Sequence, residues 1–272
     1  MNKPWLDNNA IFRARSYDDA AEAYERINAP LFFEKPARAL AEFAGIERGQ
    51  RALDVGAGTG AVTRAIHALG AEVVSFDPSV PMLNAAVRGG ASLPVCGALP
   101  DLPFRDAVFD RVCSAFVLTH VDDPEASIQG MARVLRPGGR IALTAWSPSV
   151  DPYTAAWNDV VSEFVAPEKI AAAAQQVLPG EPRFSREDGL KELLVAAGLR
   201  DVIRETRTFE FAMRVEGMIG SREVSASGRA LRMLLTDEQW NACRLKAREA
   251  LGRKFPDEIS YPRQVFFAAG TI

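Results

Sequence analysis

The sequence predicts an α/β protein with a doubly wound, mostly parallel, Rossmann-like sheet. Short runs rich in β-branched residues have the composition of strands that are buried on both faces: "ALDV", "EVVSF", "RVCSAFVL" and "IALTAW". Segments with helical spacing separate these runs, and turns that contain glycine or proline punctuate them. Strand and helix in regular alternation favour right-handed crossovers in a parallel sheet.

The region before the first strand has apolar residues at helical spacing. Its sequence, "SYDDAAEAYERINAPLFFEKPARALAEFAGI", is interrupted at Pro30 and Pro36 and is closed by Gly45. We therefore expect two or three helices here, and we assign residues 1–48 to an N-terminal helical lid.

Residues 49–146 are the expected ligand-binding α/β core. The helix "AVTRAIHAL" follows the first strand and ends at Gly70. The helix "VPMLNAAVR" has Ser79 as its expected N-cap and Pro81 in its first turn, and "PEASIQGMARVL" begins with Pro124. A Pro-Gly-Gly turn in "RVLRPGGRIALTAW" is expected to lead into the last strand of this core.

Beyond Trp146 the alternation of strand and helix breaks. The segment "DPYTAAWNDVVSEFVAPEKIAAAAQQVL" is helical without an intervening strand, so residues 147–185 are predicted to form a helical cap insertion. Residues 186–272 are predicted to complete the sheet with the strands "DVIRETRTFEFAM" and "RQVFFAAGTI". A second helical insertion, at about 214–258, is expected between these two strands.

Length, charge and cysteine content limit the class of protein. The 272 residues are 48% hydrophobic, which is enough for the core of one large α/β domain. A formal net charge of −3 gives no bulk attraction to nucleic acids or acidic membranes, so a small-molecule partner is expected. The three cysteines form no CxxC pair, which argues against a disulfide framework and a zinc site.

No stretch of the sequence approaches the roughly 20 apolar residues of a membrane span, and the first residues lack the apolar run of a signal peptide. We therefore expect a cytoplasmic protein without a membrane span. The sequence indicates no oligomeric state.

The loop in "RALDVGAGTGAVT" is the candidate ligand site. Gly56, Gly58 and Ala61 satisfy the dinucleotide fingerprint, and Asp77 follows at about the 20-residue distance that this fingerprint requires. Glycines let the backbone approach a ligand closely, and a carboxylate at the end of the second strand can accept ribose hydroxyls. On these residues alone, NAD, a flavin, another adenosine-containing ligand and a tight turn without ligand all stay open.

Four motifs in order resemble the class I S-adenosylmethionine-dependent methyltransferases, especially the small-molecule group that includes the ubiquinone and menaquinone methyltransferases. The motifs are "LDVGAGTG", "VVSFDPS", "LPFRDAVFDRV" and "RVLRPGG", and the close match runs from Tyr24 to Trp146. Asp54 and Gly60, which a pyrophosphate cradle does not need, are features of this family. The resemblance implies a seven-stranded sheet whose antiparallel last strand, "RQVFFAAGTI", lies beside "IRETRTFEF", with helical cap insertions.

The resemblance also implies S-adenosyl-L-methionine as cofactor and S-adenosyl-L-homocysteine as product. The glycine loop would pack against the methionine part of the cofactor, while Asp54 would help to hold its amino group and Asp77 would bind the ribose. Met82 would lie along the adenine. The expected cofactor-binding residues are Tyr24, Asp54, Gly56, Ala57, Gly58, Asp77, Pro78, Met82, Ala98, Leu99, Ser114 and Ala115.

One of these positions departs from the family. Ala98 stands where the family often has Asp or Asn to bond the adenine amino group, which leaves the Leu99 amide to read the adenine ring. A reshaped adenine pocket is expected from this difference.

His120 in "AFVLTHVDD" is the candidate catalytic residue, as a general base, and its alternative role is packing. Aromatic and flexible apolar side chains are expected to cover the cofactor and hold the acceptor, although an ordinary core position is the alternative for each. These candidate acceptor residues are Phe32, Phe33, Trp146, Tyr153, Trp157 and Met213.

The sequence therefore predicts a methyltransferase that moves a methyl group to an oxygen, nitrogen or carbon of a small, partly apolar molecule. No metal is expected, because the positive sulfur of the cofactor already provides the leaving group. The alternative is a protein that binds S-adenosylmethionine in an assembly or regulatory role without methyl transfer. Ala98 favours this alternative, whereas Asp54, Gly58 and Asp77 favour an enzyme.

Overall fold

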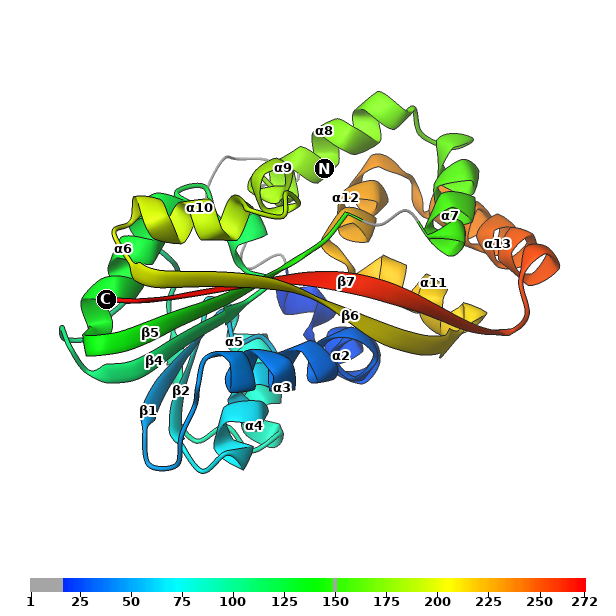
Figure 1. Ribbon diagram of the computed structural model, residues 1–272. Helices are drawn as coiled ribbons and strands as arrows, with labels where there is room; N and C mark the ends of the chain where they lie inside the picture. Colours follow the sequence, from blue (N-terminus) through cyan, green and yellow to red (C-terminus); the bar gives the residue numbers. More distant parts are fainter. Residues whose placement is uncertain (1–16, 149–150) are drawn as a thin grey trace.

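The computed structural model describes residues 17–148 and 151–272, and these contain one seven-stranded sheet. The strand order is β3-β2-β1-β4-β5-β7-β6 (Figure 1). Strands β1 to β5 pair in parallel, while β7 (Glu258–Thr271) is antiparallel to β5 and to β6. The predicted α/β class, the antiparallel last strand and its place beside the sixth strand are confirmed.

The remaining strands follow the chain order. Their bounds are β1 (Arg51–Val55), β2 (Glu72–Asp77), β3 (Pro94–Cys96), β4 (Phe109–Ala115), β5 (Leu135–Trp146) and β6 (Arg200–Arg214).

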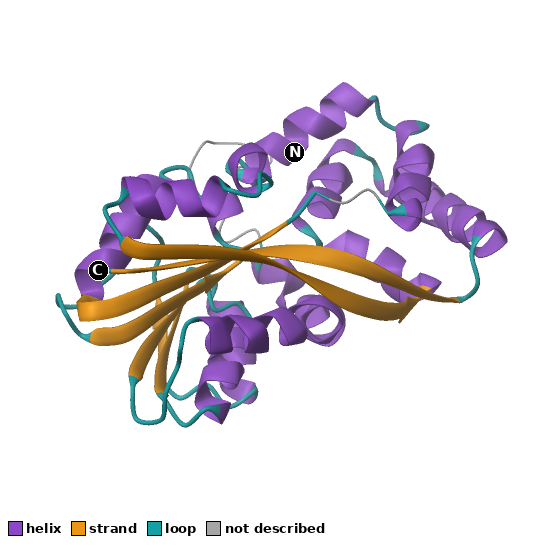
Figure 2. Ribbon diagram, viewed as in Figure 1, coloured by secondary structure: helices purple, strands orange, loops and turns teal. Residues whose placement is uncertain are grey.

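Helices occupy both faces of the sheet and one end of it (Figure 2). From residue 17 to the middle of the chain they are α2 (Ala21–Ala23), α3 (Glu34–Phe43), α4 (Ala61–Ala68), α5 (Val80–Arg88) and α6 (Pro124–Val134). The short 3-10 helices η2 (Asp18–Ala20) and η4 (Leu118–His120) and the π-helix η3 (Tyr24–Phe33) lie in the same part. In the second half they are α7 (Pro152–Ser162), α8 (Pro167–Val177), α9 (Glu181–Phe184), α10 (Gly189–Ala196), α11 (Val215–Val224), α12 (Ala226–Leu234) and α13 (Asp237–Lys254).

The predicted helix starts in the core are confirmed. The Ser79 side chain accepts a hydrogen bond from the Met82 backbone N–H at 3.3 Å, so it is the N-cap of α5, and Pro81 lies in the first turn. Pro124 begins α6 behind the N-cap Asp123.

The predicted break at Pro30 is wrong. Helical structure continues from Ala21 to Phe43, and its middle part widens into the π-helix that contains Pro30. Proline has no N–H to donate, and its ring clashes with the carbonyl four residues earlier in an α-helix, so a wider turn accommodates it without ending the helix. Pro36 lies in the first turn of α3, where proline is tolerated.

The predicted strand "RVCSAFVL" is too long. Strand β4 ends at Ala115 because Phe116 adopts a left-handed φ of 61°, after which the chain enters η4. This change of direction turns the Phe116 side chain and the residues after it toward the ligand-binding edge of the sheet.

The Pro-Gly-Gly turn lies within the bounds of β5, not before the strand. Phe109 pairs with Leu135 and Arg111 pairs with Arg140, so β5 contains extra residues between these two pairs and bulges there. Gly138 has a φ of +78°, a conformation that suits glycine, and it lets this bulge fold back into the sheet.

Two apolar layers enclose the sheet. Ile128 and Met131 of α6 and Leu193 of α10 are buried on one face. Leu40 of α3 and Ile66 of α4 are buried on the other face. Figure 1 shows α6 and α10 on one side of the sheet and α3 and α4 on the other. The layers hold the parallel strands together, so that their carboxyl ends lie at the same edge of the sheet. Open α/β sheets bind ligands at this edge.

Strands β6 and β7 extend beyond β5 as a two-stranded ribbon. Strand β5 ends at Trp146 opposite Val265, whereas β6 and β7 pair as far as Arg214 opposite Glu258. Figure 1 shows this ribbon running to α7, α11 and α13, which pack around its far end. The buried residues there include Trp157, Val161, Phe211, Met218, Trp240 and Leu251.

Helices thus occur in both ranges where cap insertions were predicted. The division into residues 1–48, 49–146, 147–185 and 186–272 stays a prediction, and residues 1–16 and 149–150 lie outside the described residues. Within the described ranges, no helix combines the length and apolar character needed to cross a membrane.

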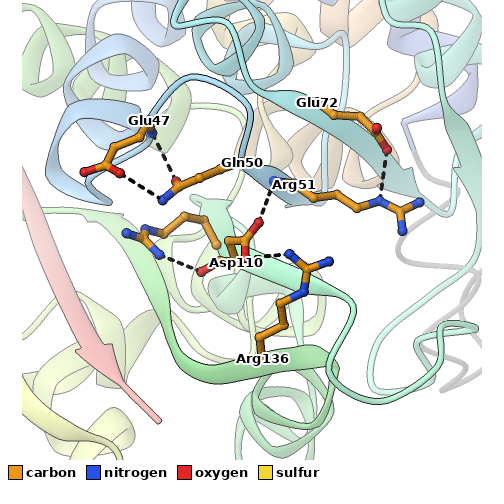
Figure 3. A network of polar contacts seen from close by, with 7 residues as sticks. Glu47, Gln50, Arg51, Glu72, Asp110 and Arg136 are labelled. Atoms are coloured by element: carbon orange, nitrogen blue, oxygen red, sulfur yellow. Dashed lines mark hydrogen bonds and ion pairs between the residues drawn. The ribbon is translucent and has the colours of Figure 1, made fainter.

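A polar network joins the strands at their amino ends, opposite the ligand edge (Figure 3). Asp110 accepts hydrogen bonds from the Arg51 backbone N–H at 2.8 Å and from the Arg136 guanidinium at 2.7 Å. Burial alone raises the pKa of Asp110, but these donors outweigh it and lower the pKa below its usual range. Because its charges are paired among themselves, we assign this network to structure and not to ligand binding.

Candidate cofactor and acceptor site

A cavity of about 390 Å³ opens at the carboxyl ends of β1, β2, β4 and β5. Its walls come from the glycine loop, the N-terminal helices and the helices α9, α11 and α12. The structure brings twelve of the predicted site residues together there: Tyr24, Phe32, Phe33, Gly56, Ala57, Gly58, Asp77, Pro78, Met82, Ala115, His120 and Trp146.

The glycine loop borders the cavity, and its backbone conformation and surroundings favour glycine at two positions. A Cβ atom on Gly56 would lie 2.2 Å from Val117 Cγ2, so only glycine fits under this neighbour. A Cβ atom on Gly58 would meet nothing within 4 Å, and the φ of +52° still favours glycine there. The open space beside Gly58 lets a ligand come into direct contact with the backbone of the loop.

Asp77 is tied into this loop through both carboxylate oxygens. Oδ2 accepts from the Gly58 N–H and Oδ1 accepts from the Ser79 N–H, each at 2.8 Å. A carboxylate offers about four lone-pair sites, so these bonds leave room for two ribose hydroxyls. Burial raises the pKa of Asp77 to about 6, and the two backbone hydrogen bonds limit that rise. The group therefore remains ionised at pH 7 and above.

Asp54 lies beneath the loop and does not line the cavity. It is only 1% exposed, and its Oδ2 accepts from the Thr63 hydroxyl at 2.7 Å. Its Oδ1 has no partner among the described residues, and burial raises the pKa of Asp54 to about 7. A buried carboxylate with one oxygen unpartnered, lying under the loop, fits a ligand that carries positive charge above it.

The N-terminal helices cover the cavity with aromatic rings. Tyr24 stacks on Phe33 with ring centroids 5.3 Å apart, and Tyr17 meets Tyr24 edge-on at 5.8 Å. The Arg229 guanidinium of α12 lies 3.7 Å from the Tyr17 ring centroid. This contact joins the lid to the second helical insertion.

His120 lines the cavity, but its ring is engaged on both sides. Nδ1 lies 3.3 Å from the Val177 carbonyl oxygen, which can only accept, so Nδ1 carries the proton. Nε2 is then the acceptor for the Tyr17 hydroxyl at 3.5 Å. Burial, with a contribution from the Arg229 charge, lowers the pKa of His120 to about 4. This arrangement favours the packing role over general-base catalysis.

One wall of the cavity is aromatic. Phe116 stacks on Trp146 with centroids 4.4 Å apart, and Phe33 meets both rings edge-on. The Arg263 guanidinium lies 3.9 Å from the Trp146 ring centroid on the same wall. The sequence prediction missed Phe116 because the residue was placed inside a strand.

Besides Asp54, three predicted cofactor residues lie outside the cavity lining. Ser114 is buried in β4, where its hydroxyl donates to the Val55 carbonyl oxygen at 3.0 Å. Ala98 and Leu99 are half-buried in the loop after β3, and Leu99 packs against the core below α6.

Three predicted acceptor residues also lie elsewhere. Trp157 and Met213 are buried in the apolar core around the far end of β6, and Tyr153 contacts Phe255 there. The ribbon formed by β6 and β7 carries this core past the end of β5, so side chains that face inward there pack on cap helices. They do not line the cavity, so they are not in a position to contact an acceptor bound there.

Several polar residues that line the cavity were not predicted from the sequence. Asn28, on the π-helix, is only 5% exposed and lines the cavity, and its Oδ1 has no partner among the described residues. Glu181, Arg222 and Ser225 line it from α9, α11 and the start of α12. The one available signal was the spacing of Tyr24, Asn28 and Phe32, which places an amide on the ring-bearing side of a helix.

Comparisons with known proteins identify the family of the chain. A family model described as a methyltransferase domain matches residues 53–143. A demethylmenaquinone methyltransferase from Mycolicibacterium paratuberculosis is 36% identical over 171 residues, covering 61% of this chain and 71% of that protein. One from Beutenbergia cavernae is 33% identical over 206 residues, covering 74% and 86%. One from Paenarthrobacter aurescens is 30% identical over 169 residues, covering 61% and 66%.

Solved structures share the fold at lower identity. The Haemonchus contortus phosphoethanolamine N-methyltransferase 2, solved with phosphomonomethylethanolamine and S-adenosylhomocysteine, has a TM-score of 0.59 and 20% identity, covering 97% of this chain and 59% of that chain. The [4+2]-cyclase SpnF has a TM-score of 0.52 and 18% identity, covering 87% and 80%. Fold alone does not fix the reaction, but sequence similarity across most of the Beutenbergia protein does fix the family. The chain belongs to the class I S-adenosylmethionine-dependent methyltransferases, in which it resembles the menaquinone methyltransferase group.

Proposed function

We propose that this methyltransferase methylates a small, partly apolar molecule that lies against the wall of Phe33, Phe116 and Trp146. The observation that carries the proposal is that this stacked aromatic wall and the glycine loop line the same cavity. A cavity of about 390 Å³ suits small ligands, and stacked rings offer a planar apolar molecule a large contact area.

The residues at the sheet edge fit the cofactor. Asp77 would accept the ribose hydroxyls, Gly58 would let the backbone approach the methionine part, and Met82 would lie along the adenine. The buried charge of Asp54 would balance positive charge above the loop. When bound, S-adenosylmethionine supplies a methyl group on positive sulfur, so the new bond to the acceptor oxygen, nitrogen or carbon forms as the sulfur–methyl bond breaks.

The chain itself would contribute mainly position and the exclusion of water. His120 is neutral and weakly basic, and its Nε2 is engaged by Tyr17, so it would not take a proton from the acceptor. The acceptor proton would instead leave to water as the new bond forms. Holding two reactants in line can supply about 7–11 kcal/mol of the barrier lowering by itself.

Transfer of label from methyl-labelled S-adenosylmethionine into a deproteinised bacterial extract tests the proposal. We expect labelled small molecules with the parent protein and a strong reduction with Asp77→Ala at limiting cofactor. Label found only in added tRNA or protein would contradict the small-molecule acceptor. S-adenosylhomocysteine binding without transfer to any added acceptor would support the role of a non-catalytic binding protein.

A further inference from the structure

The cavity has a polar side formed by the start of α12 and the end of α11. Ser225, Ala226 and Ser227 line the cavity at the amino end of α12, a helix of 9 residues. The Ser225 side chain caps the helix by accepting the Gly228 N–H at 3.1 Å. The N–H groups of the first turn before Gly228 have no partner inside the helix, and the helix dipole makes this end positive.

Arg222 adds a full positive charge to this side of the cavity. The side chain is half-buried and lines the cavity, and its guanidinium donates to the Thr154 hydroxyl. Among residues 17–148 and 151–272 it forms no ion pair. On the neighbouring helix α13, Arg244 and Arg248 are paired with Glu223 and Glu216 of α11. Arg222 therefore differs from its neighbours in having only a neutral partner.

Asn28 gives an independent indication that a polar ligand enters this cavity. Its side chain is 5% exposed, lines the cavity from the π-helix, and leaves Oδ1 without a partner among the residues described. The π-helix packs against α11, where Ile27 contacts Gly220, so Asn28 approaches the cavity beside the helix that carries Arg222. A buried amide oxygen without a partner costs free energy that a ligand O–H or N–H can recover.

The cavity has charged groups of opposite sign on two different sides. Asp77 lies at the loop side, while Arg222 and the amino end of α12 lie at the cap side. Glu181 also lines the cavity; burial raises its pKa, and the nearby Arg263 charge opposes that rise. Arg263 also lines the cavity, over the Trp146 ring and near Glu181, whereas the guanidinium of Arg222 donates to a neutral hydroxyl. A guanidinium in a half-buried site binds a carboxylate or phosphate more strongly than any neutral group.

We infer that the acceptor carries an anionic group, a carboxylate or a phosphate, which binds Arg222 at the amino end of α12, while an O–H or N–H of the same molecule donates to Asn28. The inference rests on the proposed function, because it describes the acceptor of that site. It defines the substrate class as a small organic acid whose apolar body lies on the wall of Phe33, Phe116 and Trp146. The carboxylate of the cofactor could also bind Arg222, so the test must distinguish an anionic acceptor from the cofactor.

Benzoate and benzamide are suitable probes because they have nearly the same size and shape and differ in charge. Each is titrated into the protein with S-adenosylhomocysteine already bound, and ligand-observed NMR measures the affinity. We expect benzoate to bind about 10-fold more tightly than benzamide, the scale of a hydrogen bond to a charged group. In Arg222→Gln this preference should disappear.

The matched control is Arg248→Gln, which removes the same charge from α13, outside the cavity, and should keep the preference for benzoate. Asn28→Leu should weaken the binding of both 4-hydroxybenzamide and 4-hydroxybenzoate, since it removes the acceptor for their donors. No preference for benzoate in the parent protein, absent binding included, would overturn the inference.

Affinity for S-adenosylhomocysteine separates this inference from the proposed function. Arg222→Gln should bind it as tightly as the parent protein does. A loss of about 10-fold or more would assign Arg222 to the cofactor carboxylate and would overturn the inference, while leaving the proposed function intact. Failure of the parent protein to bind S-adenosylhomocysteine would instead overturn the proposed function.

Discussion

The carboxylate of Asp77 holds the Gly58 amide at 2.8 Å, so the residue proposed to bind the ribose also shapes the loop proposed to hold the methionine part of the cofactor. The second oxygen of Asp77 holds the Ser79 amide, which precedes α5. One side chain thus fixes the ends of β1 and β2 relative to each other.

Replacing Asp77 should weaken cofactor binding more than it weakens the fold. We expect Asp77→Ala to lower the affinity for S-adenosylhomocysteine by about 1.5–3 kcal/mol, because hydrogen bonds to a charged acceptor are lost. Calorimetric titration measures this change. Asp77→Asn is the matched control, since its amide oxygen can still accept one hydrogen bond, and it should lose less. An unchanged dissociation constant in a folded Asp77→Ala protein would refute the ribose role.

Asp54 should make the ligand-free protein less stable at alkaline pH. Burial raises its folded-state pKa from the ordinary 3.8 to about 7, so the folded state binds more protons than the unfolded state between these values. The free energy of unfolding should therefore fall as the pH rises from about 4 to about 7 and then level off.

Asp54→Asn removes this titration while keeping an acceptor for Thr63. We expect it to raise the free energy of unfolding at pH 8 by about 1–3 kcal/mol and to flatten the pH dependence. Urea denaturation at pH 5 and pH 8 measures both effects. Asp77 titrates in the same direction in both proteins, so the comparison isolates Asp54; equal pH dependence in parent and variant would contradict the buried-charge interpretation.

Replacing His120 should cost little turnover, in a way that does not depend on pH. Its pKa of about 4 leaves it neutral throughout the physiological range, and its partners are Tyr17 and the Val177 carbonyl group. We expect His120→Ala to lose less than about 10-fold in turnover, below the usual 100-fold or more of a general base. Tyr17→Phe, which removes only the hydroxyl, should produce part of the same loss. A large loss in His120→Ala that high pH restores would make His120 the base.

Trp157 should matter for stability and not for the acceptor. It is 5% exposed in the core at the far end of β6 and β7 and does not line the cavity. We expect Trp157→Ala to lower the free energy of unfolding by about 3–5 kcal/mol. Where the variant remains folded, its affinity for S-adenosylhomocysteine should be unchanged. Full stability with altered turnover would place Trp157 at the acceptor after all.

The sequence predicted the parts of the fold that depend on local pattern. β-Branched runs located the buried strands, and Ser79, Pro81 and Pro124 marked helix starts because capping and proline geometry act within one turn. The order of the glycine loop and Asp77 likewise predicted which residues meet at one sheet edge, since the carboxyl ends of parallel strands lie together.

The parts that it missed depend on tertiary structure. The π-helix around Pro30 and the left-handed Phe116 are backbone states that residue type alone does not specify. Trp157 and Arg222 both lie in helical insertions. The path of the β6–β7 ribbon determines that Trp157 is buried in a core, whereas Arg222 lines the cavity. Apolar spacing predicts that a side chain is buried, but not against which neighbour.

Calorimetric titration of the purified protein with S-adenosylhomocysteine and, separately, with NAD shows which of the two ligands the glycine loop binds. The glycine loop satisfies the fingerprint of both ligand classes, whereas the buried charge of Asp54 and the family relationship favour the sulfonium cofactor and its product. We expect saturable binding of S-adenosylhomocysteine at one site per chain and no binding of NAD. Binding of NAD without binding of S-adenosylhomocysteine would contradict this expectation.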